Sequence, residues 1–381
     1  MEVLILSCGT GGGHDAAGHA VEEAMLRRGH RVTMFNPYTL KSDKLAHTID
    51  WGYIKIAQKT PWLFGLIYRI GNLYRYLPWR SPVYHVNKAM GARLEQYLKE
   101  HPCDVILMPH PFPGEILTGL KDRGIRVPKM IYIATDYTCV PFSEELKCDA
   151  YVIPARELKG EFVRFGLPEE RLYPLGIPVS ARFTQPVTRA EARQALGLEQ
   201  DKHYVLISGG SIGAGQIWQI VHSLHKRSRT DESKGAVVIC GNHRSLYERM
   251  QAHYGDRIRI LERTDRMDLY MKACDVFISK PGGLSSTEAA VTGIPLVHMK
   301  PIPGCETRNL RYFGRRGMSL ALKGTGKALF FCLEQAEKPE QRQKMLENQS
   351  RCINPRAAED ICDLAEALVG ENTAELEEKR A

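Results

Sequence analysis

The sequence lacks the features of several protein classes. It has no run of about 18 apolar residues, so we expect no transmembrane helix. Glu2 and the glycines after Leu6 interrupt the first apolar stretch, so we expect no signal peptide. The ten cysteines include no C-x-x-C pair and no cluster with metal-ligand spacing, and several lie in apolar runs typical of buried thiols in a reducing compartment. With 43% hydrophobic and 25% charged residues, the composition is that of a soluble globular protein.

Acidic residues are absent from one long window, residues 51–94. This window holds seven lysines and arginines and three of the four tryptophans, while the net charge of the whole chain is +8. Its segment TPWLFGLIYRIGNLYRYLPWR mixes aromatic and aliphatic side chains with arginines, which is typical of a helix in a bilayer interface with anionic lipid. A core helix with a basic rim and an RNA-binding surface are the alternatives, and the absence of acids favours the membrane. The predicted membrane- and acceptor-facing residues are Trp51, Trp62, Phe64, Tyr68, Arg69, Arg75, Trp79 and Arg80.

A third glycine is missing from the loop after the first apolar run. In CGTGGGHDAAGHA, residues 8–20, Gly9 and Gly11 fit the dinucleotide pattern G-x-G-x-x-G, but His14 takes the third place. Asn36 follows the next predicted strand, where that pattern needs an acidic residue for the ribose. A plain strand-to-helix turn would explain the glycines but not a histidine at the start of a helix. His14 is therefore a candidate catalytic group, because imidazole exchanges protons near neutral pH.

Short apolar runs alternate with helical patterns along the whole chain, which indicates parallel sheets. A segment rich in proline and polar residues, residues 174–198, separates two such halves. We predict an α/β fold with two doubly wound Rossmann-like domains that face a central cleft, the default place for a binding site. Strands are expected at residues 3–6, 31–35, 105–108, 130–134, 150–153 and 172–175, and at residues 204–208, 236–240, 258–261, 276–279 and 296–298. The predicted domains are residues 1–178, residues 179–352 and a helical tail over residues 353–381.

Three glycine-containing turns follow predicted strands in the second half, at residues 208–216, 281–283 and 301–304. A glycine turn at a helix N-terminus presents N–H groups and the positive end of the helix dipole to an anion such as a diphosphate. Each turn alone could be an ordinary loop, but three at the carboxyl ends of parallel strands converge on one crevice. We expect Ser285 or Ser286 to cap the helix after the second turn. Glu288, one helical turn further on, is placed to accept hydrogen bonds from a ribose diol.

Two of these stretches carry a family resemblance. KPGGLSSTEAAVTGIPLV, residues 280–297, and PIPGCETRN, residues 301–309, resemble the diacylglycerol glycosyltransferases. These include bacterial glucosyldiacylglycerol synthases and plant monogalactosyldiacylglycerol synthases, and they are related to the peptidoglycan lipid-intermediate N-acetylglucosaminyltransferase. GTGGGH, TDYT at residues 135–138 and GIPVSARF at residues 176–183 also resemble this family, in the same order along about residues 1–365. The resemblance implies the GT-B fold, a UDP-sugar donor and an inverting transfer.

The resemblance also implies roles for individual residues. His14 matches the proposed general base, and Asp136 matches the acidic residue of the TDYT motif, which either competes for the base role or orients His14. Glu306 and Asn309, three apart on one helix face, match the segment that faces the donor sugar. The implied UDP-sugar-binding residues are Gly210, Ser211, Ile212, Gly213, Lys280, Gly282, Gly283, Leu284, Ser285, Glu288, Glu306 and Asn309.

Two positions depart from the family pattern. Cys305 stands where the family usually has glutamine, and a thiol is a weak hydrogen-bond partner, so the preference for the donor sugar stays open. Ser143 stands where related sequences often carry tryptophan, so the acceptor region differs. No D-x-D motif for a metal ion occurs, and we expect helix N-termini and a cationic group to stabilise the leaving diphosphate without metal or cofactor.

We predict an enzyme that transfers a hexose, with glucose favoured, from a UDP-sugar to the hydroxyl of diacylglycerol. The expected partners are the UDP-sugar, diacylglycerol and an anionic phospholipid membrane, and nucleic acid is not expected. The protein is expected on the inner, cytoplasmic face of the cell membrane. The alternatives are transfer from UDP-N-acetylglucosamine to a polyprenyl-linked lipid intermediate, a UDP-N-acetylglucosamine 2-epimerase, and a non-catalytic membrane-bound sensor of UDP-sugar.

Overall fold

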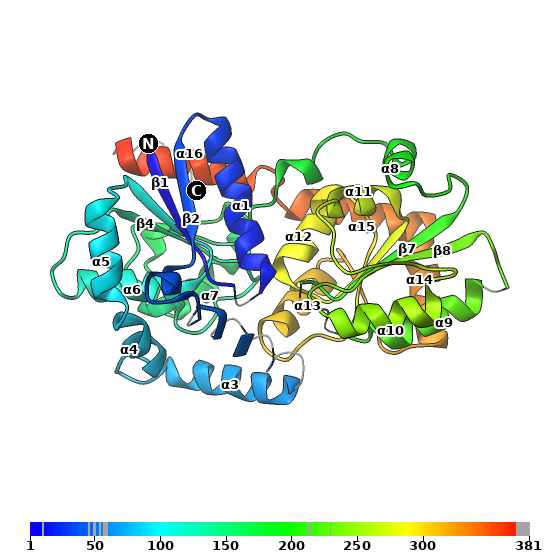
Figure 1. The fold of residues 1–381 in the computed structure, drawn as a ribbon, viewed down its shortest axis with the longest axis horizontal. Coiled ribbons are helices and arrows are strands. Elements are labelled where there is room, and N and C mark those ends of the chain that lie inside the picture. The colour runs from blue at the N-terminus through cyan, green and yellow to red at the C-terminus, as the bar shows by residue number, and fades with distance from the viewer. Residues whose placement is uncertain are drawn as a thin grey trace. The chain divides into compact units, whose positions relative to one another are not determined.

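The computed structural model describes residues 1–370 except residues 10, 45, 49–50, 53–54, 56–59, 212, 214 and 229. The described chain forms two compact units (Figure 1). The first comprises residues 1–180 together with residues 354–370, and the second comprises Ala181–Ile353. Each unit contains one six-stranded sheet in which all paired strands are parallel. The α/β class with two doubly wound sheets that the sequence predicts is confirmed.

The first sheet has the strand order β2-β1-β3-β4-β5-β6. Its strands are β1 (Glu2–Leu6), β2 (Arg31–Phe35), β3 (Val105–Met108), β4 (Lys129–Ile133), β5 (Ala150–Val152) and β6 (Leu172–Tyr173). The helices of this unit are α1 (Gly12–Arg27), α3 (Pro61–Tyr74), α4 (Pro82–Lys88), α5 (Gly91–Glu100), α6 (Pro111–Lys121), α7 (Lys159–Arg164) and α16 (Ala357–Gly370). Short 3-10 helices lie at η1 (Pro37–Leu40), η2 (Ser143–Glu145), η3 (Arg156–Leu158) and η4 (Glu169–Arg171).

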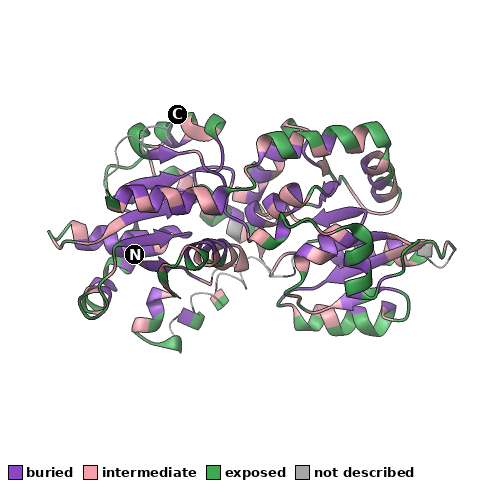
Figure 2. Ribbon diagram, turned by 90° about the horizontal axis from the view of Figure 1, so that it is seen from above, coloured by how far each residue is buried: buried purple, intermediate pink, exposed green. Residues whose placement is uncertain are grey.

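Both faces of the sheet are buried along the strands other than β2, which explains why those strands read as continuous apolar runs. The edge strand β2 is partly exposed. Val3 and Ile5 of β1 lie in a core that also contains buried side chains of α1 and α16. Leu4 and Leu6, which point to the opposite face, lie in a second core that contains buried side chains of α6. Figure 2 shows the buried strands between helices that are exposed on their outer sides.

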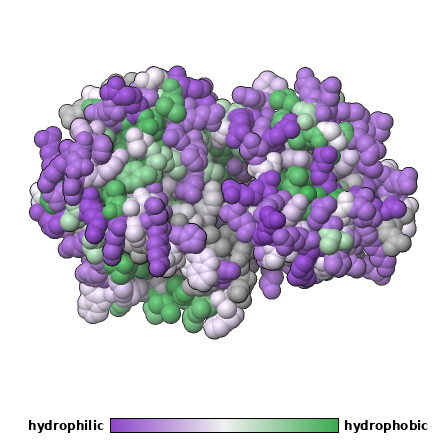
Figure 3. Space-filling view, viewed as in Figure 1, coloured by the Kyte–Doolittle hydropathy of each residue, from purple (hydrophilic) through white to green (hydrophobic). Residues whose placement is uncertain are grey.

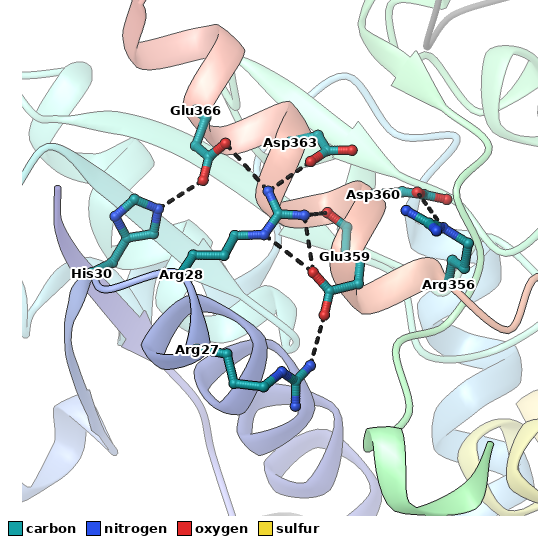
Figure 4. A network of polar contacts seen from close by, with 8 residues as sticks. All are labelled: Arg27, Arg28, His30, Arg356, Glu359, Asp360, Asp363 and Glu366. Atoms are coloured by element: carbon teal, nitrogen blue, oxygen red, sulfur yellow. Dashed lines mark hydrogen bonds and ion pairs between the residues drawn. The ribbon is translucent and has the colours of Figure 1, made fainter. Parts of the chain in front are cut away.

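The C-terminal helix α16 belongs to the first unit, although the sequence placed it in a separate tail. It packs against α1, and ion pairs of Arg27 and Arg28 with acidic residues of α16 join the two helices (Figure 4). The apolar positions of α16 complete the core on one face of the sheet. Sequence periodicity marks such a face but does not identify the sheet that it covers.

The second sheet has the strand order β12-β11-β10-β7-β8-β9. Its strands are β7 (His203–Ser208), β8 (Lys234–Ile239), β9 (Arg259–Leu261), β10 (Val276–Ser279), β11 (Leu296–His298) and β12 (Leu320–Ala321). The helices of this unit are η5 (Ala181–Phe183), α8 (Arg189–Leu196), α9 (Ile217–Ser228), α10 (Arg244–Tyr254), α11 (Met267–Ala273), α12 (Gly283–Thr292), α13 (Cys305–Arg315), α14 (Lys327–Glu337) and α15 (Pro339–Cys352). The sequence did not predict β12.

The strand order reverses once in each sheet, and these reversals locate the candidate site. In the first sheet the reversal lies between β1 and β3, and in the second it lies between β7 and β10. The loops that leave neighbouring strands at such a point run to opposite faces of the sheet and open a crevice at the carboxyl ends. The glycine loop with His14 follows β1, and the glycine loops at Gly210 and Gly282 follow β7 and β10. The expected cleft between the domains stays a prediction.

Candidate functional site

His14 lies in the first turn of α1, beside the ends of two other strands. Its Nδ1 is 2.8 Å from the carbonyl oxygen of Pro109, which follows β3. The same nitrogen is 2.9 Å from Oγ1 of Thr135, which follows β4. A carbonyl oxygen only accepts hydrogen bonds, so Nδ1 carries the proton and donates it to Pro109. Nε2 is then the ring nitrogen with a lone pair, which is the state that a general base needs.

A second histidine, His110, packs against the ring of His14. The ring of His110 meets that of His14 edge to face, with centroids 4.5 Å apart. Nδ1 of His110 accepts a hydrogen bond from the backbone N–H of Phe112 and thereby caps α6. Burial, and secondly the neighbouring His14, hold the pKa of His110 well below its usual range. His110 therefore stays neutral and adds no positive charge that would oppose protonation of His14.

The TDYT loop, residues 135–138, is held by an acidic residue that the sequence analysis did not single out. Glu161 of α7 accepts hydrogen bonds from Oγ1 of Thr138 at 2.5 Å and from the backbone N–H of Cys139 at 3.0 Å. Within the loop, the N–H of Thr138 donates to the carbonyl oxygen of Asp136 at 2.7 Å. Thr135, Pro109 and Glu161 are thus supporting residues. In the sequence, the segment PHPFPGE lies where a strand ends and a capped helix begins. This pattern could have indicated Pro109 and His110 as residues of the site. The role of Asp136 stays a prediction.

In the second unit, the loop after β7 requires glycine at two positions. Gly210 has φ 68°, and a Cβ atom there would lie 2.6 Å from Cε of Lys280. Gly213 has φ 61°, and a Cβ atom there would lie 2.2 Å from the carbonyl oxygen of Cys240. The loop therefore lies close against the end of β10 and against the end of β8. Ile212, one of the predicted nucleotide-binding residues, lies outside the described residues.

The helix after β10 begins earlier than the predicted capping residues indicated. α12 starts at Gly283 with Gly282 as its N-cap and without a capping side chain, so the predicted caps Ser285 and Ser286 lie inside the first turn. Oγ of Ser286 instead lies 2.9 Å from Nε2 of His298, whose Nδ1 is 3.0 Å from Oγ of Ser319. Burial lowers the pKa of His298 to about 3, so this histidine is a neutral brace between α12 and the neighbouring strands.

Glu288 lies one turn into α12, as the sequence predicts, and is half-buried. Burial raises its pKa to about 7; the charge of Arg182 works against this shift and that of Asp268 adds to it. A carboxyl group with this pKa changes charge close to neutral pH. Perturbed carboxyl groups of this kind are typical of binding and catalytic sites.

Lys280, Glu306 and Asn309 form direct links between β10 and α13. The ammonium group of Lys280 forms an ion pair with Oε1 of Glu306, and Oε2 of Glu306 accepts from the backbone N–H of Ile302 at 2.8 Å. Nδ2 of Asn309, which is fully buried, donates to the carbonyl oxygen of Pro281 at 3.0 Å. In this structure Asn309 holds the Pro281–Gly283 turn in place. The contact of Glu306 and Asn309 with a donor sugar stays a prediction.

The basic aromatic segment forms α3, and one side of this helix is apolar and exposed. Leu73 is 70% exposed and Trp62 is 68% exposed, which is unusual for large apolar side chains. Figure 3 shows apolar side chains on the surface over α3. The opposite side packs on the protein, because a Cβ atom at Gly71 would lie 3.3 Å from Cβ of Pro141. The exposed apolar residues of this region, named the α3 surface below, are Trp62, Leu66, Ile67, Ile70, Leu73, Tyr76, Leu77 and Trp79.

Two predicted lipid-contacting arginines have protein partners instead. The side chain of Arg75 is 2% exposed and forms an ion pair with Glu144 at 2.7 Å, and its guanidinium lies 3.6 Å from the ring centroid of Phe165. Arg80 is half-buried and donates to the carbonyl oxygen of Glu145. The two arginines anchor α3 to the loop after β4, so we do not count them in the α3 surface.

The other residues predicted to face the membrane or the acceptor differ in their exposure. Arg69 is exposed, Tyr68 is half-buried, and Trp51 is 54% exposed. The side chain of Phe64 lies outside the described residues. Over the part of the chain that the structure describes, we find no helix that is both long and apolar enough to cross a membrane.

Solved structures with the same fold include glycosyltransferases and related enzymes. MurG from Acinetobacter baumannii superposes with a TM-score of 0.60 at 16% identity, over 96% of this chain and 99% of that one. A UDP-GlcNAc 2-epimerase from Neisseria meningitidis, bound to UDP-GlcNAc, gives a TM-score of 0.61 at 12% identity, over 96% and 99%. At these identities the likeness shows the fold alone, and that fold is GT-B.

Sequence comparison distinguishes between the glycosyltransferases and the epimerases that share this fold. Residues 14–179 match the family model of monogalactosyldiacylglycerol (MGDG) synthase, and residues 204–305 match that of the glycosyltransferase family 28 C-terminal domain. The protein is therefore a glycosyltransferase with the GT-B fold. It is 26% identical over 326 residues to the processive diacylglycerol beta-glucosyltransferase of Bacillus subtilis, over 84% of this chain and 83% of the relative. These matches agree with the resemblance to diacylglycerol glycosyltransferases that the sequence motifs indicated.

Proposed function

We propose that the protein transfers glucose from UDP-glucose to the hydroxyl group of diacylglycerol at a membrane surface, with inversion at the anomeric carbon. The observation that carries the proposal is the match of residues 14–179 to the MGDG synthase family model, since this unit holds both His14 and the α3 surface. The relatives named diacylglycerol beta-glucosyltransferase support glucose as the sugar. The general fold does not distinguish this activity from epimerisation.

In the proposed reaction, His14 acts on the acceptor. Nε2 of His14 removes the proton of the acceptor hydroxyl while that oxygen attacks the anomeric carbon of the donor. The hydrogen bond from Nδ1 to Pro109 fixes the ring and stabilises the imidazolium that forms. Thr135 accepts from the same nitrogen and limits rotation of the ring. Asp136, adjacent in the chain, is the alternative base.

The second unit binds the donor in this proposal. The diphosphate lies at the N-terminus of α12, where the helix dipole and the backbone N–H groups favour an anion. Gly210 and Gly282 let the backbones of the two loops approach the phosphates closely. Glu288 accepts hydrogen bonds from the ribose diol. UDP and UDP-GlcNAc are bound by two proteins of the same fold, which supports a uridine nucleotide as the ligand.

The α3 surface brings this unit to the lipid. Insertion of its exposed side chains into the headgroup region removes apolar area from water, and Arg69 adds attraction to anionic phospholipid. Diacylglycerol stays in the bilayer, so an enzyme that uses it must reach the bilayer surface. We propose a peripheral location on the cytoplasmic face of the cell membrane, where UDP-sugars are made.

A non-metal mechanism is part of the proposal. Lys280 and the N-terminus of α12 supply positive charge for the leaving UDP, and this is the role that a divalent ion has in other transferases. Transfer should continue after EDTA treatment and should not rise when Mg²⁺ or Mn²⁺ is added back. Loss of transfer in EDTA with recovery on adding either ion would refute metal independence.

Product analysis tests the function itself. The purified protein is incubated with vesicles of diacylglycerol and anionic phospholipid and with UDP-glucose, UDP-galactose or UDP-N-acetylglucosamine in turn, and the lipids are identified by mass spectrometry. We expect hexosyldiacylglycerol, formed fastest from UDP-glucose. A product only with UDP-N-acetylglucosamine and a polyprenyl-linked acceptor would support the alternative transferase. UDP binding without any product would support a sensor.

A further inference from the structure

The ion pair between Lys280 and Glu306 links the turn after β10 to α13, and the proposed function uses the charge of Lys280 but gives no role to the pair itself. We propose that it is exchanged during donor binding: the diphosphate replaces Glu306 as the counterion of Lys280, and the released carboxylate turns to the hydroxyl groups of the sugar. The inference rests on the proposed function, because it assumes that a nucleoside diphosphate sugar binds this unit. It adds a residue pair that couples phosphate binding to sugar binding.

The position of the ammonium group supports the exchange. Nζ of Lys280 lies 3.7 Å from the point that a Cβ atom would occupy at Gly210, and 3.8 Å from that point at Gly282. The ammonium therefore lies between the glycine turns that follow β7 and β10, on the two sides of the point where the strand order reverses. Gly210 and Gly282 have no side chains, so neither of these two residues separates Nζ from an anion that approaches past them.

The burial of the pair explains why an exchange is favoured over simple release. The side chains of Lys280 and Glu306 are 16% and 8% exposed, and a buried charge without a partner is strongly destabilising. A diphosphate provides Lys280 with a new partner of at least equal charge. Glu306 retains the hydrogen bond from the N–H of Ile302 and gains sugar hydroxyl donors. Both charges therefore keep partners before and after the donor binds.

A pair that only braces α13 against β10 would behave differently. In that case the loss of Glu306 would leave the affinity for UDP unchanged or would weaken it, because the loop geometry would suffer. In the exchange, Glu306 competes with the diphosphate for Lys280. Removal of Glu306 should then strengthen the binding of UDP while it weakens the use of the complete donor.

Titration calorimetry with the full-length protein and its variants tests this difference. We expect E306Q to bind UDP roughly fivefold more tightly than the unmodified protein, a factor that corresponds to about 1 kcal/mol. K280M should bind UDP roughly tenfold more weakly, and the double variant K280M/E306Q should bind it like K280M alone. Uridine, which has no phosphates, should bind all four proteins equally. E199Q, which breaks the exposed pair of Lys202 and Glu199 in the same unit, is the matched control and should bind UDP normally.

The outcomes separate the inference from the proposed function. If the unmodified protein does not bind UDP, both fail. If it binds UDP but E306Q binds no more tightly, or if the effects of K280M and E306Q on affinity are additive, the exchange is wrong and the donor site stands. If thermal melting shows that E306Q does not fold, E306D replaces it. Its shorter side chain keeps the charge but weakens the pair, so a gain in UDP affinity supports the exchange and the absence of a gain refutes it.

Discussion

Nδ1 of His14 lies 2.8 Å from the carbonyl oxygen of Pro109. This contact connects the helix that follows β1 with the loop that follows β3, across the point where the strand order of the first sheet reverses. Because the carbonyl oxygen can only accept, the contact determines which nitrogen of His14 donates and which accepts. Nε2 of His14 is then left with a lone pair, which is the state that the proposed base role needs.

Substitution of His14 should separate transfer from nucleotide binding. We expect H14A to reduce the rate of glucosyl transfer roughly 10²- to 10⁴-fold, the usual range for a general base, and to leave the affinity for UDP nearly unchanged. H19A is the matched control, since His19 lies on the same helix and pairs only on the surface with Glu22. A steady-state assay of UDP release with diacylglycerol vesicles measures both variants. Transfer by H14A at the normal rate would remove His14 from the base role and favour Asp136.

The pH dependence of donor binding should follow Glu288. Burial raises its pKa from 4.5 to about 7, so the carboxylate that we propose as the acceptor for the ribose diol forms only as the pH rises through 7. We expect the affinity for UDP-glucose to increase between pH 6 and pH 8 as Glu288 loses its proton. The diphosphate of this diester stays ionised over that range, so it adds no pH dependence of its own. E288Q should bind more weakly and without this dependence. An equal pH dependence in E288Q would assign the titration to another group.

The same shift predicts a stability effect of opposite sign. The folded protein holds the proton of Glu288 up to about pH 7, whereas the unfolded chain releases it near pH 4.5. The unfolded state thus binds fewer protons between these values, so the contribution of Glu288 lowers stability as the pH rises through this window. E288Q should remove this loss and melt higher than the unmodified protein at pH 8, with little difference at pH 4.5. Thermal melting of E288Q and of the unmodified protein at the two pH values measures this difference in stability.

Apolar residues of the α3 surface should control membrane binding. The double variant W62S/L73S removes two of its most exposed side chains and should reduce binding to vesicles that contain anionic phospholipid roughly tenfold or more. F331S is the matched control, because Phe331 is 64% exposed but lies on α14 of the second unit. Vesicle flotation measures binding. Equal flotation of W62S/L73S and the unmodified protein would show that α3 does not contact the lipid.

The polar network between α1 and α16 should stabilise the first unit. Arg28 donates to Glu359, Asp363 and Glu366 at 2.9, 2.6 and 3.2 Å (Figure 4). Burial opposes the charge on Arg28, but these acidic partners outweigh burial and raise its pKa.

We therefore expect R28Q to lower the free energy of unfolding by about 2 kcal/mol, since it removes hydrogen bonds between charged groups. R356Q, which breaks the exposed pair of Arg356 and Asp360, should change it by less than about 0.5 kcal/mol. Urea denaturation, followed by a signal from the first unit, measures the free energy of unfolding of both variants. Equal losses in the two variants would mean that the Arg28 network does not hold α16.

The sequence predicted the strands and the glycine turns because their signals are local. β2, β3, β10 and β11 lie where the alternation of apolar runs and turns placed them. The partners of the site residues were not predictable in this way. Pro109 and Thr135 are far from His14 in the chain, and only the pairing of β1 with β3 and of β3 with β4 brings them together.

Two corrections have a similar cause. Arg75 carries the sign of charge expected at an anionic surface, but sequence cannot show that Glu144 lies within reach of it. Ser286 has the residue type of an N-cap, but the helix begins at Gly283 and turns this side chain toward His298. In both cases the residue type was compatible with two environments, and the tertiary structure selected the one that the local pattern did not indicate.

The most direct test of the account follows the sugar itself. The full-length protein is given UDP-glucose labelled in the glucose, with vesicles of anionic phospholipid that contain or lack diacylglycerol, and the label in the organic phase is counted. We predict that label enters the lipid only when diacylglycerol is present, in a β-linked glucosyldiacylglycerol and in amounts equal to the UDP released. UDP release or conversion of the sugar nucleotide without label in the diacylglycerol fraction would contradict transfer to this lipid.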